Sequence, residues 1–380
     1  MRLAVLCPRF PYPLEKGDKL RIYHQLRLLS DDNEICLICL SDGPVEPTAL
    51  SVIEDITATC HVFTISAWSR KWSAARALVT GTSLQNAHYY NRSVHTSVKQ
   101  VLADFAPDHV YCQLTRMAPY LQGLPYSKTL DYMDAFGVGM ERRAKVTSGL
   151  QSVLYQIEAR RCKKYESEVY QQFDHHTIIS EQDRQHIGDG NLDITVNPNG
   201  IDTSYFAPID KVKDHEIGFV GNMGYPPNID AAEYLINTLQ LGRKHTVLIA
   251  GARPDKRVKL LANANVTITG WVDDVRQEYA RCKIFVAPLW SGTGQQNKIL
   301  EAMAMGIPCV TTSAVNNAIK AEDGKEVLIA DSAHGFDQAI QRLLTDDGLY
   351  NDLRENSIRL VKEHYSWRHN VDLLQTIFNK

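Results

Sequence analysis

The sequence predicts an α/β protein built from two doubly wound parallel sheets, and three observations indicate this class. Short apolar segments of strand length alternate with longer helical segments through most of the 380 residues. The alternation runs from Leu3 to Ile179 and begins again at Glu216. A segment rich in Pro, Asn and Gly separates the halves. Strands that alternate with helices form parallel sheets covered on both faces, and the length suits two domains.

The first half contains a series of strand-length apolar segments. These are Leu3–Cys7, Glu34–Leu40, Val62–Ile65, His109–Tyr111, Lys128–Asp131 and Thr177–Ile179. Residues 18–29 follow the first strand and have helical periodicity, with Leu20, Leu26 and Leu29 on the apolar side. Cys36 and Cys39 form a C-x-x-C pair, but they lie inside the second apolar segment and lack a second such pair. We therefore expect buried, reduced cysteines rather than a metal or redox site.

The second half repeats the pattern. Its strand-length segments are Glu216–Val220, Thr246–Ala250, Val266–Thr269, Ile284–Ala287, Cys309–Thr311 and Val327–Ile329. The turn-forming segment Pro198-Asn199-Gly200 places the domain boundary near residue 196. We therefore expect one domain over residues 1–195 and a second over 196–362. The final segment, 363–380, reads as an amphipathic helix whose apolar residues are Val371, Leu374 and Ile377.

Composition excludes several classes of protein. The net charge of −3 offers no overall basic surface for a nucleic acid. No apolar segment approaches the roughly 20 residues that span a bilayer. The first predicted strand begins at Leu3, directly after Met1 and Arg2, so no signal peptide is expected before it. These features indicate a cytoplasmic enzyme.

Residues 284–308 contain the most informative pattern, a strand followed by a Gly-containing loop and a helix that begins near Asn297. The start of such a helix presents free N–H groups and a positive dipole end to an anion. Lys298 lies in the first helical turn and adds a point charge for a phosphate. Glu301 lies one turn further, where its carboxylate can accept hydrogen bonds from ribose hydroxyls. The pattern predicts a nucleotide site; the alternative is a core helix with a solvated Lys298.

The same residues carry a resemblance to a known family. Glu301-Ala302-Met303-Ala304 and Gly306-Ile307-Pro308 resemble the signature of glycosyltransferase family 4, which has the GT-B fold. Residues 292–298, Gly-Thr-Gly-Gln-Gln-Asn-Lys, resemble a bacterial branch of sugar transferases associated with exopolysaccharide and exosortase loci. The chain departs from the family at Thr293, where the family has a Glu. The resemblance implies two Rossmann-like domains that face across a cleft, with the C-terminal helix crossing back to the first domain.

The resemblance also implies the residues that contact a nucleoside diphosphate sugar. These residues are Gly17, Gly221, Asn222, Gly251, Trp271, Val272, Thr293, Gly294, Gln296 and Asn297. Asn222 stands where the family commonly has Arg, so Lys298 becomes the leading residue for the diphosphate charge. Backbone groups of Trp271 and Val272 correspond to those that hold the base. Asp273 and Asp274 look like a metal motif only superficially, and we expect helix capping there. The resemblance implies no catalytic metal and no cofactor besides the donor.

The acceptor half is less defined. Asp131 and Asp134 follow a predicted strand at the edge where parallel sheets bind ligands. We expect Asp134 to act as the general base and Asp131 to be structural, with helix capping an equal alternative for Asp134. Gln113 stands where the family often has a His. Lys19 and Arg21 either hold an anionic acceptor or coat a helix.

Residues 56–103 contain no Asp or Glu, which suggests membrane contact. Basic residues and tryptophans concentrate at 68–76, in the order Trp68, Arg70, Lys71, Trp72 and Arg76. This composition is typical of a segment that lies on an anionic membrane surface. The alternative is a solvated loop with both tryptophans folded inward.

The resemblance implies a metal-independent, hexosyltransferase-like glycosyltransferase. By the same resemblance, the sugar would pass with retention from a nucleoside diphosphate sugar to a hydroxyl of a lipid-linked or polysaccharide acceptor. The process would be exopolysaccharide or cell-surface glycan synthesis, with Asp134, Lys298 and Glu301 as catalytic residues. Two alternatives stay open, a non-catalytic nucleotide-sugar sensor and a GT-B sugar-nucleotide epimerase. The sugar, the base and the acceptor are not determined by the sequence.

Overall fold

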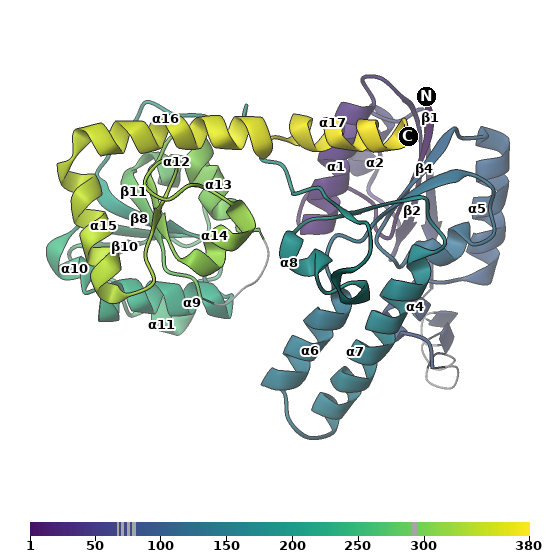
Figure 1. Ribbon diagram of the computed structural model, residues 1–380, viewed down its shortest axis with the longest axis horizontal. Coiled ribbons are helices and arrows are strands. Elements are labelled where there is room, and N and C mark those ends of the chain that lie inside the picture. Colours follow the sequence, from purple (N-terminus) through teal and green to yellow (C-terminus); the bar gives the residue numbers. More distant parts are fainter. Residues whose placement is uncertain (67, 70–71, 74–76, 78–80, 291–294) are drawn as a thin grey trace. The chain divides into compact units, whose positions relative to one another are not determined.

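The structure is a computed structural model that describes residues 1–66, 68–69, 72–73, 77, 81–290 and 295–380. Its contacts divide the chain into two compact units (Figure 1). The first unit contains residues 1–198 and 370–380, and the second contains residues 199–369. The division at Pro198 lies two residues from the position that the turn-forming segment predicts. Both units are Rossmann-like α/β domains, so the predicted fold class is confirmed.

The first unit is built on a parallel sheet with the strand order β3-β2-β1-β4-β5-β6-β7. Its strands are β1 (Arg2–Cys7), β2 (Glu34–Ser41), β3 (Thr59–Thr64), β4 (His109–Gln113), β5 (Ser127–Asp131), β6 (His175–Ile178) and β7 (Thr195–Val196). The order reverses between β1 and β4. In open parallel sheets this switch point, at the carboxyl ends of the strands, is where ligands bind.

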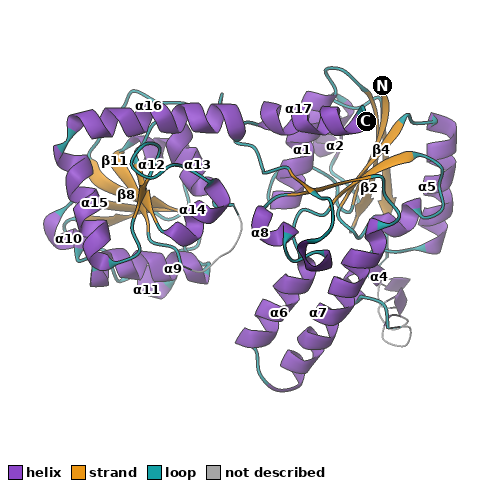
Figure 2. Ribbon diagram, viewed as in Figure 1, coloured by secondary structure: helices purple, strands orange, loops and turns teal. Residues whose placement is uncertain are grey.

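Helices lie on both faces of this sheet, and the pair α6 and α7 extends away from it (Figure 2). The helices of this unit before residue 198 are α1 (Gly17–Leu29), α2 (Pro47–Glu54), α4 (Leu84–Ala87), α5 (Arg92–Phe105), α6 (Phe136–Val146), α7 (Gly149–Tyr170) and α8 (Glu181–Arg184). Helices α6 and α7 lie side by side and were not assigned from the sequence (Figure 1). The carboxylate of Glu166 on α7 accepts hydrogen bonds from the Gly137 N–H at the start of α6, at 3.3 and 3.4 Å.

Alternation within the central strand β1 explains why it is apolar from Leu3 to Cys7. In β1, Ala4 and Leu6 belong to the core on one face, whereas Leu3, Val5 and Cys7 belong to the core on the other. A sheet buried on both faces needs continuous apolar strands. Cys36 and Cys39 of β2 are buried free thiols on opposite faces, as their apolar segment predicts.

The end of the chain packs in the first unit. Helix α17 (Trp367–Phe378) contributes Val371, Leu374 and Ile377 to the core that also contains Ile22 and Leu26 of α1. These are the three apolar residues that the sequence places on one side of the final helix. Burial of side chains of this size stabilises a domain by about 1.5–3 kcal/mol each.

A buried ion pair lies at the carboxyl ends of β4 and β5. Arg21 of α1 donates to Asp131 at 2.7 Å, and both side chains are fully buried. The Tyr111 hydroxyl donates to the same carboxylate at 2.8 Å, and Arg21 also donates to the Asn197 carbonyl at 3.0 Å. Asp131 is therefore structural, as expected. Arg21 neither coats a helix nor faces an acceptor, because its charge is needed to balance a carboxylate in the core.

The second unit has a parallel sheet with the order β10-β9-β8-β11-β12-β13. Its strands are β8 (His215–Val220), β9 (Val247–Ala250), β10 (Val266–Ile268), β11 (Cys282–Ala287), β12 (Cys309–Thr311) and β13 (Leu328–Ile329). Its helices are α9 (Pro226–Glu233), α10 (Leu241–Lys244), α11 (Lys256–Lys259), α12 (Val275–Ala280), α13 (Asn297–Ala304), α14 (Ser313–Ile319), α15 (Ala333–Thr345) and α16 (Asp347–His364). The order reverses between β8 and β11, so the loops after these two strands flank the switch point.

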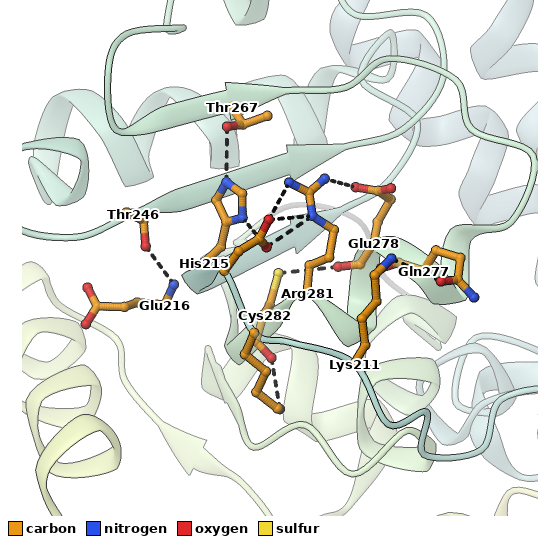
Figure 3. Close-up of polar contacts among 11 residues, drawn as sticks. Lys211, His215, Glu216, Thr246, Thr267, Gln277, Glu278, Arg281 and Cys282 are labelled. Carbon is orange, nitrogen blue, oxygen red and sulfur yellow. Dashed lines mark hydrogen bonds and ion pairs between the residues drawn. The ribbon is translucent and has the colours of Figure 1, made fainter.

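A polar network secures the amino ends of β8 and β11 (Figure 3). Arg281 donates to both carboxylate oxygens of Asp214, at 3.0 to 3.2 Å, and to Glu278 at 2.9 Å. His215 lies between Asp214 and Thr267, with nitrogen–oxygen distances of 2.8 and 3.1 Å. Arg281, more than His215, lowers the pKa of Asp214 to about 2. The network lies at the sheet edge opposite to the switch-point loops, so its role is structural.

Candidate functional site

Glycines bring the loops after β8, β9 and β10 into close contact at the carboxyl edge of the second sheet. The Gly251 N–H donates to the Gly270 carbonyl at 3.0 Å, and the Gly221 N–H donates to the Ala250 carbonyl at 3.0 Å. A Cβ atom on Gly251 would lie 1.7 Å from the Gly221 carbonyl oxygen, and the φ of Gly251 is 138°. Gly251 is therefore required for the packing of one loop on the other.

Lys298 lies in the first turn of α13 and reaches toward the loop after β8. Its ammonium donates to the Asn228 side-chain oxygen at 2.5 Å, and the Asn228 amide donates to the Asn222 carbonyl at 2.9 Å. The structure thus connects Lys298 with Asn222 through Asn228 of α9. Burial lowers the pKa of Lys298 to about 8, although the nearby Glu301 acts in the opposite direction.

Glu301 lies one turn further along α13 and is held by a buried tyrosine. The hydroxyl of Tyr279, on α12, donates to a Glu301 carboxylate oxygen at 2.8 Å and lies 3.1 Å from the Lys298 carbonyl oxygen. Burial raises the pKa of Glu301, while Tyr279 and Lys298 lower it. Lys298 and Glu301 therefore lie one helical turn apart on α13, as their spacing predicts, and each affects the pKa of the other.

Sequence reasoning missed Tyr279 and Asn228 as site residues. No local pattern indicated Tyr279, because it follows Arg276, Gln277 and Glu278 in α12, and its burial became evident only in the structure. Asn228 follows Pro226 and Pro227. These three residues stand where the family resemblance would place a lysine that contacts the diphosphate. The polar character of Asn228 inside an otherwise apolar helix face, where it is 3 % exposed, was the signal available there.

The loop before α13 is described in part. Thr293 and Gly294, predicted to contact the donor, lie outside the described residues. Gln295 exchanges hydrogen bonds with the Asn199 backbone, at 2.9 and 2.7 Å. Gln296 precedes α13 and Asn297 begins it. The Asn297 side-chain oxygen is buried and lacks a hydrogen-bond donor among the described residues, so it is available to a ligand group.

The loop after β10 presents the residues predicted to hold a base. Trp271 is 71 % exposed, and Val272 is half-buried. Asp274 caps α12 by accepting the Arg276 N–H at 3.0 Å, and its carboxylate also pairs with the Arg276 guanidinium at 2.8 Å. The predicted capping role of Asp274 is confirmed. In the part of the chain that the structure describes, no group of three His, Cys, Asp or Glu side chains is placed to hold a metal ion.

Asp134 belongs to the first unit, where it follows β5. It is open to solvent, but the surrounding protein partly desolvates its carboxylate, and Asp183 and Asp131 add negative charge nearby. These effects raise its pKa to about 6. The preceding residue, Met133, has a φ of 61°, a conformation that costs a non-glycine residue about 1–3 kcal/mol. No side-chain cap is formed by Asp134, because α6 begins after Ala135.

Gly17 begins α1, after the long loop that follows β1. A Cβ atom at this position would meet no atom of the described structure within 4 Å. Packing within the first unit therefore does not explain the glycine, in contrast to Gly251.

The basic segment 68–76 is described only at some of its residues. Trp68 and Trp72 are 74 % and 73 % exposed, so neither is folded inward. Arg70, Lys71 and Arg76 lie outside the described residues. Among the helices of the described residues, none is both long and apolar enough to cross a membrane.

A cavity of about 640 Å³ lies near the amino ends of β11 and β12. It is lined by Lys283 and Ile307, among others, and does not include Lys298 or Glu301. Its position at the edge opposite to the switch-point loops separates it from the candidate site.

Comparison with known proteins agrees with this arrangement. Residues 214–346 match the family described as "Glycosyl transferases group 1", and this range contains Asn222, Lys298 and Glu301. HepE from Anabaena in complex with UDP is similar in structure, with a TM-score of 0.71, 12 % identity and coverage of 100 % of both chains. The fold is GT-B.

Two further solved structures support this fold. Sucrose-phosphate synthase from Thermosynechococcus elongatus has a TM-score of 0.69 and 13 % identity, and the match covers 100 % of this chain and 98 % of that one. The lipopolysaccharide outer core galactosyltransferase WaaB, in its apo form, has a TM-score of 0.63 and 14 % identity, with coverage of 100 % and 99 %. No curated protein matches the sequence. At such identities the structural likeness concerns the GT-B fold alone.

Proposed function

We propose that this protein is a glycosyltransferase that moves a sugar from a nucleoside diphosphate sugar to a hydroxyl group. The observation that carries the proposal is the placement of Lys298 and Glu301 one turn apart on α13, where Lys298 donates to Asn228 and Glu301 accepts from Tyr279. A cation for phosphate and a carboxylate for ribose lie one helical turn apart, inside the range that matches the glycosyl transferases group 1 family. HepE has been solved with UDP and with UDP-glucose, so uridine nucleotides are the first donors to test.

In the proposed mechanism the protein stabilises the departing nucleoside diphosphate. The bond between the anomeric carbon and the diphosphate oxygen breaks, and both electrons stay with that oxygen. Lys298 and the free N–H groups of the first turn of α13 then face the developing negative charge, which is electrostatic catalysis. With a pKa of about 8, Lys298 is mostly protonated at neutral pH. Glu301 accepts hydrogen bonds from the ribose and so fixes the nucleotide.

The acceptor hydroxyl must lose a proton as it bonds to the anomeric carbon. We assign this proton to Asp134, whose pKa of about 6 leaves it ionised at neutral pH and basic enough to assist. The family resemblance supports retention of configuration and a reaction without metal. It also supports a lipid-linked or polysaccharide acceptor in exopolysaccharide or cell-surface glycan synthesis.

The exposed Trp68 and Trp72 support contact with an anionic membrane surface through residues 68–76. Such contact would bring a cytoplasmic enzyme to a lipid-linked acceptor.

A thermal-shift panel of nucleotides and nucleotide sugars tests the donor assignment. A ligand present at about 100 times its dissociation constant stabilises the folded protein by about 2.7 kcal/mol. The matching nucleoside diphosphate sugar should raise the melting temperature, and Lys298→Met should remove most of that rise. If no nucleoside diphosphate shifts the wild-type protein, the proposed donor site is wrong. Donor hydrolysis or transfer by the purified protein separates an enzyme from a sensor, and interconversion of the free donor would identify an epimerase.

A further inference from the structure

Two arginines meet at the carboxyl edge of the first sheet, apart from Asp134. Arg9 lies in the loop after β1, and Arg116 lies after β4. Both contact Tyr89, which follows α4. Phe136, the first residue of α6, completes the group. Strands β1 and β4 are neighbours at the switch point of this sheet, where ligands are expected.

The two guanidinium groups share one neutral acceptor. Arg9 donates to the Tyr89 hydroxyl at 3.0 Å, and Arg116 lies 3.5 Å from the same oxygen. The guanidinium carbon of Arg116 is 4.8 Å from the centroid of the Tyr89 ring and 4.6 Å from that of Phe136. The two rings therefore hold the plane of Arg116 in position and provide cation–π attraction.

The charges of this group do not balance. Arg9 forms an ion pair with Asp18, but the remaining direct hydrogen bond of Arg116 goes to the neutral side chain of Gln85, at 2.8 Å. Arg116 is only 8 % exposed, and its Nε atom has no hydrogen-bond acceptor among the described residues. Burial lowers the pKa of Arg116, and repulsion by Arg9 adds to the effect.

A buried arginine stays charged, and burial without a carboxylate partner is costly. An anion that bridges the two arginines would remove this cost, because guanidinium groups bind oxyanions through paired N–H donors. The rings of Tyr89 and Phe136 already restrain the larger part of the site, which reduces the entropy lost on binding.

We propose that Arg9 and Arg116 form a subsite that binds a phosphate group of the acceptor substrate. The assignment of this phosphate to the acceptor rests on the proposed function. Binding of phosphate itself does not, since the two arginines lie in the unit that does not contain Lys298 and Glu301. The shared chemistry is a phosphate ester, which a soluble phosphorylated sugar or a phospholipid headgroup would supply equally.

Thermal shift with inorganic phosphate tests the site, with chloride at matched ionic strength as the reference. Saturating UDP is added to both samples so that the donor site does not contribute. Phosphate should raise the melting temperature of the wild-type chain. Arg116→Met should lose about tenfold to hundredfold in phosphate affinity, because it removes charged hydrogen bonds. Arg116→Lys keeps the charge without the paired donors, so its phosphate affinity should lie between those of the wild type and Arg116→Met.

The matched control is Arg143→Met, which removes an exposed arginine of α6 and should bind phosphate like the wild type. Without phosphate, Arg116→Met should melt at the same temperature as the wild type or higher, because it removes an unbalanced buried charge. Equal phosphate shifts in the wild type and Arg116→Met, or no shift in the wild type, would overturn the proposal. If UDP does not raise the melting temperature, the proposed donor site is wrong. The comparison of phosphate binding between the wild type and Arg116→Met remains valid in that case.

Two further probes distinguish the source of the phosphate. Glycerol 3-phosphate represents a soluble ester, and phosphatidylglycerol vesicles, compared with phosphatidylcholine vesicles, represent a lipid headgroup. Binding that depends on Arg116 with either probe supports the subsite and identifies its source. Binding of both probes that is unchanged in Arg116→Met contradicts it.

Discussion

The Lys298 ammonium donates a hydrogen bond of 2.5 Å to the side-chain oxygen of Asn228, and this contact joins α13 to α9. Asn228 in turn donates to the Asn222 carbonyl, so the loop after β8 is tied to the same group. A lysine side chain is flexible, and ordering it before a ligand arrives lowers the entropic cost of binding. The contact therefore holds a positive charge in place at the switch point of the second sheet.

Replacement of Lys298 should separate charge from structure. Lys298→Met should weaken nucleoside diphosphate binding by about 1.5–3 kcal/mol, because charged hydrogen bonds are lost, and should leave nucleoside binding nearly unchanged. Calorimetry with UDP and uridine measures both affinities. Lys362→Met, at an exposed position of α16, is the control. Equal losses for the two ligands would show that Lys298 acts through structure.

The same residue predicts a pH dependence. Burial lowers the pKa of Lys298 to about 8, so its ammonium is lost as the pH rises through 8. The affinity of the wild type for UDP should therefore fall above pH 8. The affinity of Lys298→Met for UDP should not fall over this range, because the variant lacks the ammonium. A flat profile in the wild type between pH 7 and pH 9 would contradict the role of this charge.

Glu301→Gln should weaken donor binding while the fold is kept. A charge-assisted hydrogen bond to ribose becomes neutral, which costs about 1–2 kcal/mol. Calorimetry should show this loss for UDP and also for uridine, because ribose is common to both. Glu355→Gln, at an exposed position of α16, should bind like the wild type. Unchanged affinity in a folded Glu301→Gln protein would remove Glu301 from the site.

Asp134→Asn should reduce transfer without reducing donor affinity. General bases contribute about 10²- to 10⁴-fold, so kcat should fall within that range. Because the pKa of Asp134 is raised to about 6, its carboxylate is lost as the pH falls through 6. The kcat/KM of the wild type should decline below that pH, and the variant should lack this decline. If Asp134→Asn retained full activity, another group would have to accept the proton of the acceptor hydroxyl.

Gly251→Ala should destabilise the second unit. The new Cβ atom would lie 1.7 Å from the Gly221 carbonyl oxygen, and the φ of 138° is unfavourable for alanine. We expect a loss of at least about 1–3 kcal/mol in the free energy of unfolding, measured in denaturant. Gly324→Ala is the control, since Gly324 also has a positive φ, of 78°, but has open space around it. Equal losses of unfolding free energy in Gly251→Ala and Gly324→Ala would show that the close contact between the loops does not determine the effect.

Residues 68–76 should bind anionic vesicles. Trp68 and Trp72 are exposed, and the segment contains Arg70, Lys71 and Arg76 without an acidic neighbour. Flotation should show binding that increases with anionic lipid and decreases with salt, because surface attraction is screened within about 8 Å at physiological ionic strength. Replacement of the three basic residues by Glu should abolish it. A wild-type protein that never floats, at any lipid composition, would exclude the membrane contact.

All strands except the two-residue β7 could be located from the sequence. Parallel strands buried on two faces are continuously apolar, as Leu3–Cys7 and Ile284–Ala287 illustrate. The helices α6 and α7 could not be located in this way. Helix α7 runs for 22 residues, from Gly149 to Tyr170, but buries few of its residues and lacks a strong apolar period. Its place depends on contacts with α6, which are not visible in local sequence.

By itself the sequence determined the α/β class, a break near residue 196 and the placement of Lys298 and Glu301 one helical turn apart. These features depend on local order, because apolar alternation, turn residues and helical spacing act over a few positions. Only the tertiary structure decided that Arg21 is buried against Asp131, that Tyr279 holds Glu301, and that Arg9 and Arg116 share Tyr89. Each of these contacts joins residues that are more than 20 positions apart in the chain, so the surroundings of the charged groups are set by the packing of distant segments.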